Sequence, residues 1–332
     1  MNSVTIAWRY PAPFGLKTVA VLVAALLLLW VTGQRVEMGR MAAMSARAVL
    51  APAGLAPQSE VADGLEAVAT KLLPLQVADR TEVSRIENFD RAKLPLFAYV
   101  EATVSKVESL NPETLEMESH VERIDYLVEP IGYLAHVAAK MLETLEIALW
   151  GTILAVLIGV PMALASARNF TPWAPARGLA GAAIALTRSV PEMISALFLV
   201  LAYGFGPIPG VLALALHGGG FLGKVYAEDI ENADVRPQEA LTAIGATRLA
   251  MLRYAILPQV MPRAIASTLY VLDRNMRMAT VIGIVGAGGI GQELKGRYDM
   301  YNYGHVGTIL VAIFLVVFLL DRLASRLRRA TL

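Results

Sequence analysis

The stretch QEALTAIGATRLAMLRYAILPQ, residues 238–259, decides how this chain is interpreted. It is too polar to cross a membrane and too apolar to be a tail. Its apolar residues recur at helical spacing. They are Leu241, Ile244, Met251 and Leu252. Because long apolar runs flank the stretch on both sides, we expect a helix on the membrane surface that a partner can bind.

Other residues of this stretch refine the expectation. Pro237 suits a first helical turn, where its missing N–H costs nothing, and Glu239 is favourable near the positive end of the helix dipole. Gly245 costs about 1 kcal/mol against Ala inside a helix, so its presence predicts a close approach to the backbone. Leu257 and Pro258 are expected to end the segment.

The composition is that of a membrane protein. Of the 332 residues, 56% are hydrophobic and 17% are charged, against about 45–50% and about 25% in soluble domains. The net charge of +1 argues against a nucleic-acid partner. The chain has no Cys and its four His residues are scattered, so we expect neither disulfides nor a metal site.

Six stretches are long and apolar enough to span about 30 Å of hydrocarbon. They are residues 15–32, 144–166, 181–203, 209–227, 262–285 and 305–320. The first is interpreted as an uncleaved anchor, because no A-x-A motif follows it; a signal peptide is the alternative. In the second, Gly151 and Gly159 predict close contact with another helix.

Basic residues beside the spans indicate the orientation. They form four clusters: Arg9 and Lys17; Arg168 and Arg177; Arg236, Arg248, Arg253 and Arg263; and Arg322, Arg326, Arg328 and Arg329. With six crossings all four clusters fall on one side of the membrane, so both termini are expected in the cytoplasm.

These spans divide the chain into three parts. The first is a cytoplasmic N-terminus with the first transmembrane helix (1–33), followed by an extracytoplasmic insert (34–143) and a five-helix core (144–332) with a cytoplasmic loop at 228–262. Runs of the insert such as VADGLEAVATKLL and VEATVSKVESL are amphipathic at helical period, so we expect the insert to be helical. The fold class expected is an all-α polytopic membrane protein.

Polar residues inside the later spans indicate a pathway. The fifth span contains Asp273, Arg274, Asn275 and Arg277. Each charge at mid-helix costs about 2.5–3.5 kcal/mol, whereas each Leu, Ile or Val contributes only about −0.3 to −0.6 kcal/mol. This polar stripe must therefore face protein or water.

The third and fourth spans add further candidates. Arg188 and Glu192 are four residues apart, hence on one helical face; they form either an interfacial ion pair or a gate that contacts an anion. His217 faces the pore or has a structural role.

Two glycine motifs imitate nucleotide sites. Gly218 and the pair Gly223-Lys224 have the spacing of a phosphate loop, but Val225 stands where such a loop needs Ser or Thr. GAGGIG, at residues 286–291, has the form G-x-G-x-x-G, but a membrane span follows where a dinucleotide domain needs its acidic residue. We expect no ATP hydrolysis by this chain, no catalytic residues, and a tight re-entrant turn at residues 286–291.

The 238–259 stretch resembles the cytoplasmic coupling loop of ABC-importer permeases. The motif is E-A-A, three residues, G, nine residues, I-x-L-P. It is matched by Glu239, Ala240, Gly245, Leu257 and Pro258. Leu241 replaces the third small residue, and Ala255 stands where Ile is usual. The resemblance implies a type I importer-like permease whose coupling helix, at 237–254, contacts an ATPase.

A longer resemblance covers roughly residue 144 to the C-terminus, together with the first span. The strings RSVPEM, GVLALALH, GKVYAEDIE and LYVLDRNMRMATVIGIVGAGGIG look like the permease of bacterial phosphonate importers. This implies a homodimer in the inner membrane, two cytoplasmic ATPase subunits that bind ATP and Mg, and a periplasmic solute-binding protein. The expected substrate is phosphonate, phosphite or hypophosphite. The insert is longer than the family leads us to expect, and it is either a docking surface for the binding protein or a spacer.

Three alternatives stay open at this point. The same architecture serves other small solutes, such as methionine or another oxyanion. A secondary transporter is less favoured because no inverted repeat is visible, and a membrane enzyme is last because no nucleophile–base pair is visible. For transport, the candidate path residues are Arg188, Glu192, His217, Asp273, Asn275 and Arg277.

Overall fold

The computed structural model describes residues 15–51, 60–87, 89–91, 94–95, 97–110 and 117–331. The chain forms two compact units, Met1–Lys71 and Leu72–Leu332. The first contains the apolar helix α1 (Leu16–Arg35), then α2 (Met38–Leu50) and α3 (Glu60–Leu72). The predicted apolar helix at 15–32 is confirmed, while the prediction based on Arg9 lies outside the described residues.

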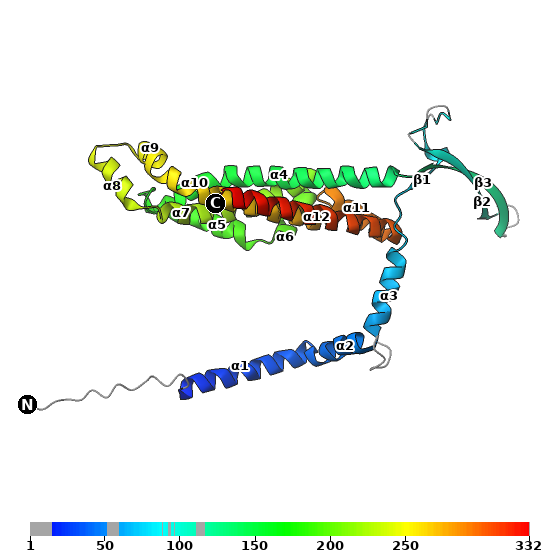
Figure 1. Ribbon diagram of the computed structural model, residues 1–332, viewed down its shortest axis with the longest axis horizontal. Helices are drawn as coiled ribbons and strands as arrows, with labels where there is room; N and C mark the ends of the chain where they lie inside the picture. The colour runs from blue at the N-terminus through cyan, green and yellow to red at the C-terminus, as the bar shows by residue number, and fades with distance from the viewer. Residues whose placement is uncertain are drawn as a thin grey trace, which may run out of the picture. The chain divides into compact units, whose positions relative to one another are not determined.

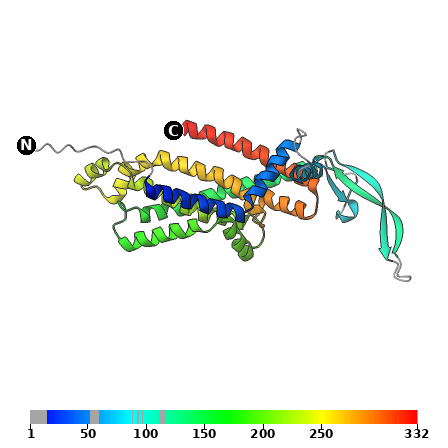
Figure 2. The same cartoon turned by 90° about the horizontal axis from the view of Figure 1, so that it is seen from below.

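The second unit is built around a bundle of long helices. Three of them, α4 (Gly132–Ser166), α10 (Leu257–Gly283) and α12 (Tyr303–Thr331), run lengthwise through the bundle in both views (Figures 1 and 2). The others are α5 (Ala174–Ser189), α6 (Glu192–Tyr203), α7 (Pro207–Glu231) and α11 (Gly289–Asp299). Among the described residues, five helices can cross a membrane, or six if α5 and α6 count as one bent span.

Close packing of α4 on α7 forms the centre of the bundle. A Cβ added to Gly159 would lie 3.1 Å from the backbone oxygen of Gly219, so only glycine allows the two backbones to approach this closely. Buried Ala155 and Leu222 continue the same contact. The prediction of a close helix contact in the second span is therefore confirmed.

The third predicted span is not one straight helix. α5 ends at Ser189, α6 begins at Glu192, and the two helices meet at 90°. Pro191 causes the break because its ring disfavours helical backbone at the preceding residue. The prediction that Arg188 and Glu192 share one helical face is wrong, since the two residues belong to different helices.

The insert is only partly helical. Strands β1 (Asp79–Glu82), β2 (Tyr99–Leu110) and β3 (Met117–Glu129) form an antiparallel sheet in the order β1–β3–β2. Val100 pairs with Leu127, and Val104 with Arg123. The run VEATVSKVESL is thus a strand, and its helical prediction is wrong: its Val and Thr residues favour strand over helix. VADGLEAVATKLL falls in α3, as predicted.

Candidate functional site

The 238–259 stretch forms several short elements at the end of the bundle where α4 and α7 end (Figure 1). α8 (Val235–Ala243) is capped by Asp234, whose Oδ1 accepts the Arg236 N–H at 3.0 Å. α9 (Arg248–Met251) is capped by Thr247, and a π-turn (Leu252–Ile256) leads directly into α10. We call residues 235–256 the coupling segment.

Gly245 separates α8 from α9, so the prediction of one continuous helix is wrong. Its φ of 75° is in the left-handed region, and an added Cβ would meet nothing within 4 Å. The prediction of a close approach to its backbone is therefore also wrong within this chain: Gly245 is needed for the turn. Leu257 and Pro258 begin α10 instead of ending the segment, with Pro in the first turn.

The coupling segment presents an exposed surface. All five residues of the motif are exposed: Glu239, Ala240, Gly245, Leu257 and Pro258. Large apolar side chains accompany them, with Ile244 78% exposed, Leu249 72% and Tyr254 64%. Exposure of several large apolar side chains to water is unfavourable, so this surface is suited to contact with a protein partner.

The segment is firmly joined to the start of α10. Gln259 Oε1 accepts the Asp234 N–H at 2.8 Å, and the Gln238 amide donates to the Asp234 carbonyl at 3.1 Å. Ala255 and Ile256 are buried. Hydrogen bonds and packing thus connect the start of α8 to the start of α10.

A half-buried ionic cluster lies at the break between α5 and α6. Glu192 forms ion pairs with Arg274 of α10 and with His217 of α7, the latter at 3.3 Å. His217 Nδ1 donates to the Val190 carbonyl at 3.2 Å. The break leaves that carbonyl without a helical partner, and a membrane provides no water to replace it. The cluster therefore stabilises the break, and Glu192 sits favourably at the N-terminus of α6.

The other polar residues of α10 that were predicted to line the path are also paired. Asp273, 5% exposed, accepts two hydrogen bonds from Arg277, at 2.9 and 3.1 Å. Asn275, 3% exposed, donates to Thr152 Oγ1 of α4 at 2.9 Å. The expectation that this polar stripe faces protein or water is confirmed for the buried residues Asp273 and Asn275.

The structure brings only some of the predicted path residues together. Glu192 and His217 meet, but Asp273, Asn275 and Arg277 make contacts of their own, and exposed Arg188 lies apart on α5. Two residues were missing from the predicted set: Arg274, which pairs with Glu192, and Thr152. The charge of Arg274 inside an apolar span was a signal for the first, whereas Thr152 carried none.

At the other end of α10, the GAGGIG turn leads into α11. The Gly289 N–H donates to Glu143 at 3.0 Å and the Ile290 N–H donates to Thr144 Oγ1 at 2.8 Å. Side chains of α4 thus satisfy the first N–H groups of α11. The tight turn predicted at residues 286–291 is confirmed by positive φ angles at three of its glycines.

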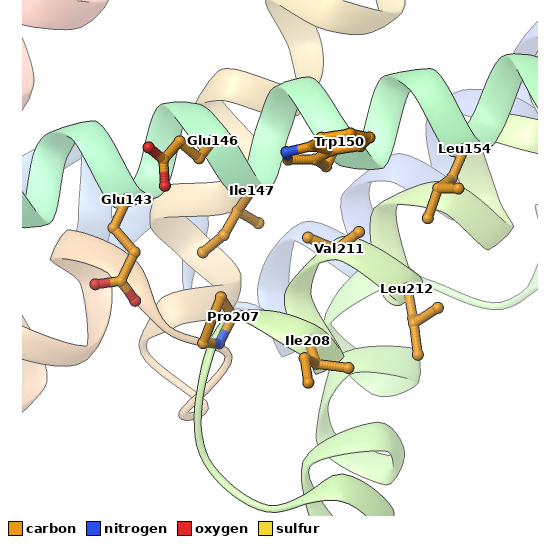
Figure 3. A pocket seen from close by; sticks show the side chains of 9 residues that line it. All are labelled: Glu143, Glu146, Ile147, Trp150, Leu154, Pro207, Ile208, Val211 and Leu212. Carbon is orange, nitrogen blue, oxygen red and sulfur yellow. The ribbon is translucent and has the colours of Figure 1, made fainter.

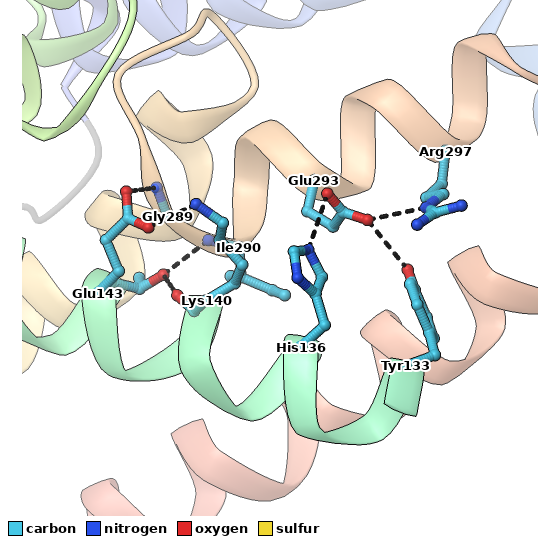
Figure 4. Close-up of polar contacts among 9 residues, drawn as sticks. Tyr133, His136, Lys140, Glu143, Gly289, Ile290, Glu293 and Arg297 are labelled. Atoms are coloured by element: carbon cyan, nitrogen blue, oxygen red, sulfur yellow. Dashed lines mark hydrogen bonds and ion pairs between the residues drawn. The ribbon is translucent and has the colours of Figure 1, made fainter. Parts of the chain in front are cut away.

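Figure 4 shows the contacts that hold α11 on α4. Glu293 lies between Arg297, at 2.8 Å, His136, at 3.3 Å, and the Tyr133 hydroxyl. Burial would raise the pKa of Glu293, but hydrogen bonds from Arg297 and His136 outweigh it and hold that pKa below its usual value. This end of the bundle is fixed by charge as well as by packing.

An open groove of about 420 Å³ lies between α4 and α7 (Figure 3). Ile147, Val211 and Leu212 line it, and its charged side chains are Glu143 and Glu146. Because carboxylates repel an anion and apolar side chains give it no hydrogen bond, the groove is unsuitable as an anion site.

Residues 152–331 match the family described as "Binding-protein-dependent transport system inner membrane component". The chain belongs to this family. It is therefore an inner-membrane permease subunit of an ABC importer, a class of protein that works with ATPase and substrate-binding partners.

Among its relatives are permeases of phosphorus transport systems. HtxE of Stutzerimonas stutzeri, assigned by name to a phosphite transport system, is 54% identical over 77% of this chain and 98% of its own length. PtxC, a phosphite transport system permease of the same organism, is 42% identical over 57% of this chain and 69% of its own length. PhnE, a phosphate-import permease of Mycolicibacterium smegmatis, is 40% identical over 60% of this chain and 37% of its own length.

Solved structures share the fold. An inward-facing structure of the MetNI methionine ABC transporter is matched with a TM-score of 0.52 and 23% identity, over 61% of this chain and 99% of the matched one. The expected type I importer fold is thus confirmed.

Proposed function

We propose that the chain carries phosphonate, or a related phosphorus oxyanion such as phosphite or hypophosphite, across the inner membrane. The observation that carries this proposal is the 54% identity to HtxE over nearly the whole of that relative. Methionine and other small solutes are less favoured, because the likeness to MetNI is 23% in sequence and extends to the fold alone.

The proposed assembly is a homodimer of this chain with two ATPase subunits and a periplasmic solute-binding protein. The ATPases bind ATP and Mg, and this chain supplies no ATPase site of its own. Both termini and the coupling segment face the cytoplasm, which agrees with the basic residues beside the spans. The motif residues Glu239, Ala240 and Gly245 are exposed, which suits contact with the ATPase.

Alternating access follows from how α10 is connected. When the ATPases close on nucleotide, they displace the coupling segment, and the hydrogen bond from the Asp234 N–H, just before α8, to Gln259 passes the displacement to α10. Arg274 of α10 then pulls or releases Glu192 at the break between α5 and α6. In this proposal, six residues form the polar lining of the transport path and change their hydrogen-bond partners as the helices move. They are Arg188, Glu192, His217, Asp273, Asn275 and Arg277. Arg188 and Arg277 offset the charge of the anion.

Transport by the reconstituted complex tests this function. Proteoliposomes containing the permease, its ATPases and its binding protein are supplied with phosphite, methylphosphonate, hypophosphite, phosphate or methionine, and ATP-dependent accumulation is measured. We expect accumulation of at least one of the first three. Accumulation of methionine or phosphate in their place would contradict the substrate class.

Two variants test the coupling route in the same assay. Glu239→Ala and Gly245→Pro should abolish uptake while leaving the amount of protein in the membrane unchanged. Asp299→Asn, an exposed acid on α11, is the matched control and should transport normally. Normal transport by both coupling variants would contradict the route.

The subunit composition requires a separate measurement. Two differently tagged copies of this chain are expressed together with the ATPases, and one tag is purified. Recovery of the second tag supports a homodimer. If the purified chain is recovered with a different permease chain and without the second tag, the assembly is a heterodimer and not a homodimer.

A further inference from the structure

A basic cavity lies along α5, between the end of α4 and the last turns of α7. Its volume is about 460 Å³, within the range of about 300–1,000 Å³ that small-molecule sites occupy. Basic side chains outnumber carboxylates in its lining. They are Arg168, Arg177, Arg188 and Lys224, against Glu228 and Glu231.

The two carboxylates are already engaged by other groups. Glu228 pairs with Lys224 at 3.1 Å. Glu231 accepts the backbone N–H of Arg168 at 2.8 Å. Within the part of the chain that the structure describes, neither carboxylate forms an ion pair with the guanidinium of Arg168 or Arg188. The cavity therefore retains uncompensated positive charge.

The third guanidinium is held in place and keeps most of its donors. Arg177 Nη1 donates to the Thr171 carbonyl at 3.1 Å, and a guanidinium has five N–H donors in a planar fork. This hydrogen bond thus positions the Arg177 guanidinium and leaves its other N–H donors available.

The wall formed by α5 is open. Gly178 and Gly181 line the cavity, and a Cβ added at either would meet nothing within 4 Å. Neither glycine packs against another part of the described chain, so the cavity is open at both positions. A small group bearing negative charge fits this space.

We propose that the cavity binds a phosphoryl-type oxyanion through the guanidinium groups of Arg168, Arg177 and Arg188. Planar guanidinium groups match two oxygens of such an anion at once. The same chemistry is offered by a free phosphorus oxyanion and by the phosphate of an anionic lipid headgroup. Arg188 is shared with the proposed transport path, whereas Arg168 and Arg177 belong to this cavity alone, so the proposal does not depend on which solute the chain transports.

Binding to the full complex in two settings tests the site and distinguishes the two sources. In detergent, calorimetry measures the affinity for inorganic phosphate and, separately, for phosphite. In nanodiscs made of phosphatidylglycerol and phosphatidylcholine in equal amounts, native mass spectrometry measures which lipid stays bound to the complex after the complex is released from the nanodisc. Each is done with the natural chain, Arg177→Gln, Arg188→Gln and the control Arg322→Gln, which removes an exposed charge on α12 outside the cavity.

We expect each cavity variant to weaken binding by about tenfold, because one charged hydrogen-bond partner is lost. The Arg322→Gln control should bind like the natural chain. Loss of phosphate or phosphite binding identifies a free anion, and loss of retained phosphatidylglycerol identifies a lipid. Arg188→Lys should retain part of the binding, which shows that a folded cavity is being measured.

Two results would overturn the proposal. One is the failure of the natural complex to bind phosphate or phosphite and to retain phosphatidylglycerol over phosphatidylcholine. The other is an equal loss of binding in Arg322→Gln and in the cavity variants, which would indicate a general effect of surface charge. Transport activity is not the readout, so failure here is distinguishable from failure of the proposed function.

Discussion

Two turns containing glycine stand at opposite ends of α10, and they use glycine for different reasons. Gly245, in the coupling segment, has a φ of 75° and open space around it. Gly283, at the start of the other turn, is packed so tightly that an added Cβ would lie 2.6 Å from the Gly288 carbonyl oxygen. The first turn requires a backbone conformation, and the second requires the absence of a side chain.

The contacts of the two turns differ in the same way. The turn after α10 is tied to α4 by Glu143 and Thr144. The turn at Gly245 is closed by its own backbone, where the Gly245 and Ala246 N–H groups each donate at 3.0 Å, to Thr242 and Leu241. The turn after α10 is therefore fixed to the bundle, whereas the coupling segment before α10 is available to a partner. A helix that carries movement from a partner into the bundle requires this difference between its two turns.

The largest effect is expected from Gly283→Ala. Its methyl group would collide with backbone that cannot move aside, so we expect little folded protein by size-exclusion chromatography. Gly245→Ala should fold and lose only about 1 kcal/mol through its positive φ. Gly296→Ala, at an open position on α11, is the control and should be as stable as the natural chain or more stable. Equal losses in Gly283→Ala and Gly245→Ala would remove the distinction between the two turns.

The ionic cluster between the two turns gives the next effect. Glu192→Gln or Arg274→Gln leaves one half-buried charge without its partner, so we expect a loss below the roughly 3–5 kcal/mol that breaking a fully buried pair costs. The double variant should lose less than the sum of the two single losses, and thermal unfolding in detergent measures all four proteins. Additive losses would show that the pair does not link α10 to the break.

The smallest effect concerns pH at the fixed end. Because the pKa of Glu293 in the folded protein lies below its unfolded value of about 4.5, its contribution is present above that pH and is lost as the pH falls through the folded pKa. At pH 7, Glu293→Gln should cost about 1 kcal/mol, a screened value for a half-buried group. The difference from the natural chain should shrink below pH 4. A constant difference from pH 7 to pH 3 would contradict the assigned contacts.

Hydropathy predicted most of the helices, because burial in lipid requires a long apolar run. It did not predict the break at Pro191, since an average over the window from residue 181 to residue 203 conceals one residue. The strands were missed because Val and Thr at residues 100–107 were judged by helical period. In each case a short local signal was outweighed by a long average.

The candidate site was predicted in composition but not in arrangement. Glu239 and Gly245 were identified from their motif, and both are exposed. The pairing of Glu192 with Arg274 joins residues far apart in the chain, and no local pattern specifies such a contact. The same holds for Thr144, whose hydroxyl accepts a hydrogen bond from Ile290.

The central claim is that a cytoplasmic ATPase binds the coupling segment, and cross-linking tests it most directly. The chain has no native Cys, so single cysteines can be introduced at Ile244, which is 78% exposed, and at Tyr298 of α11 as the control, 56% exposed. With an ATPase subunit carrying a thiol-reactive cross-linker, Ile244→Cys should cross-link to the ATPase and Tyr298→Cys should not. A transport-competent complex in which Ile244→Cys gives no cross-link, or in which Tyr298→Cys gives it instead, would contradict the claim.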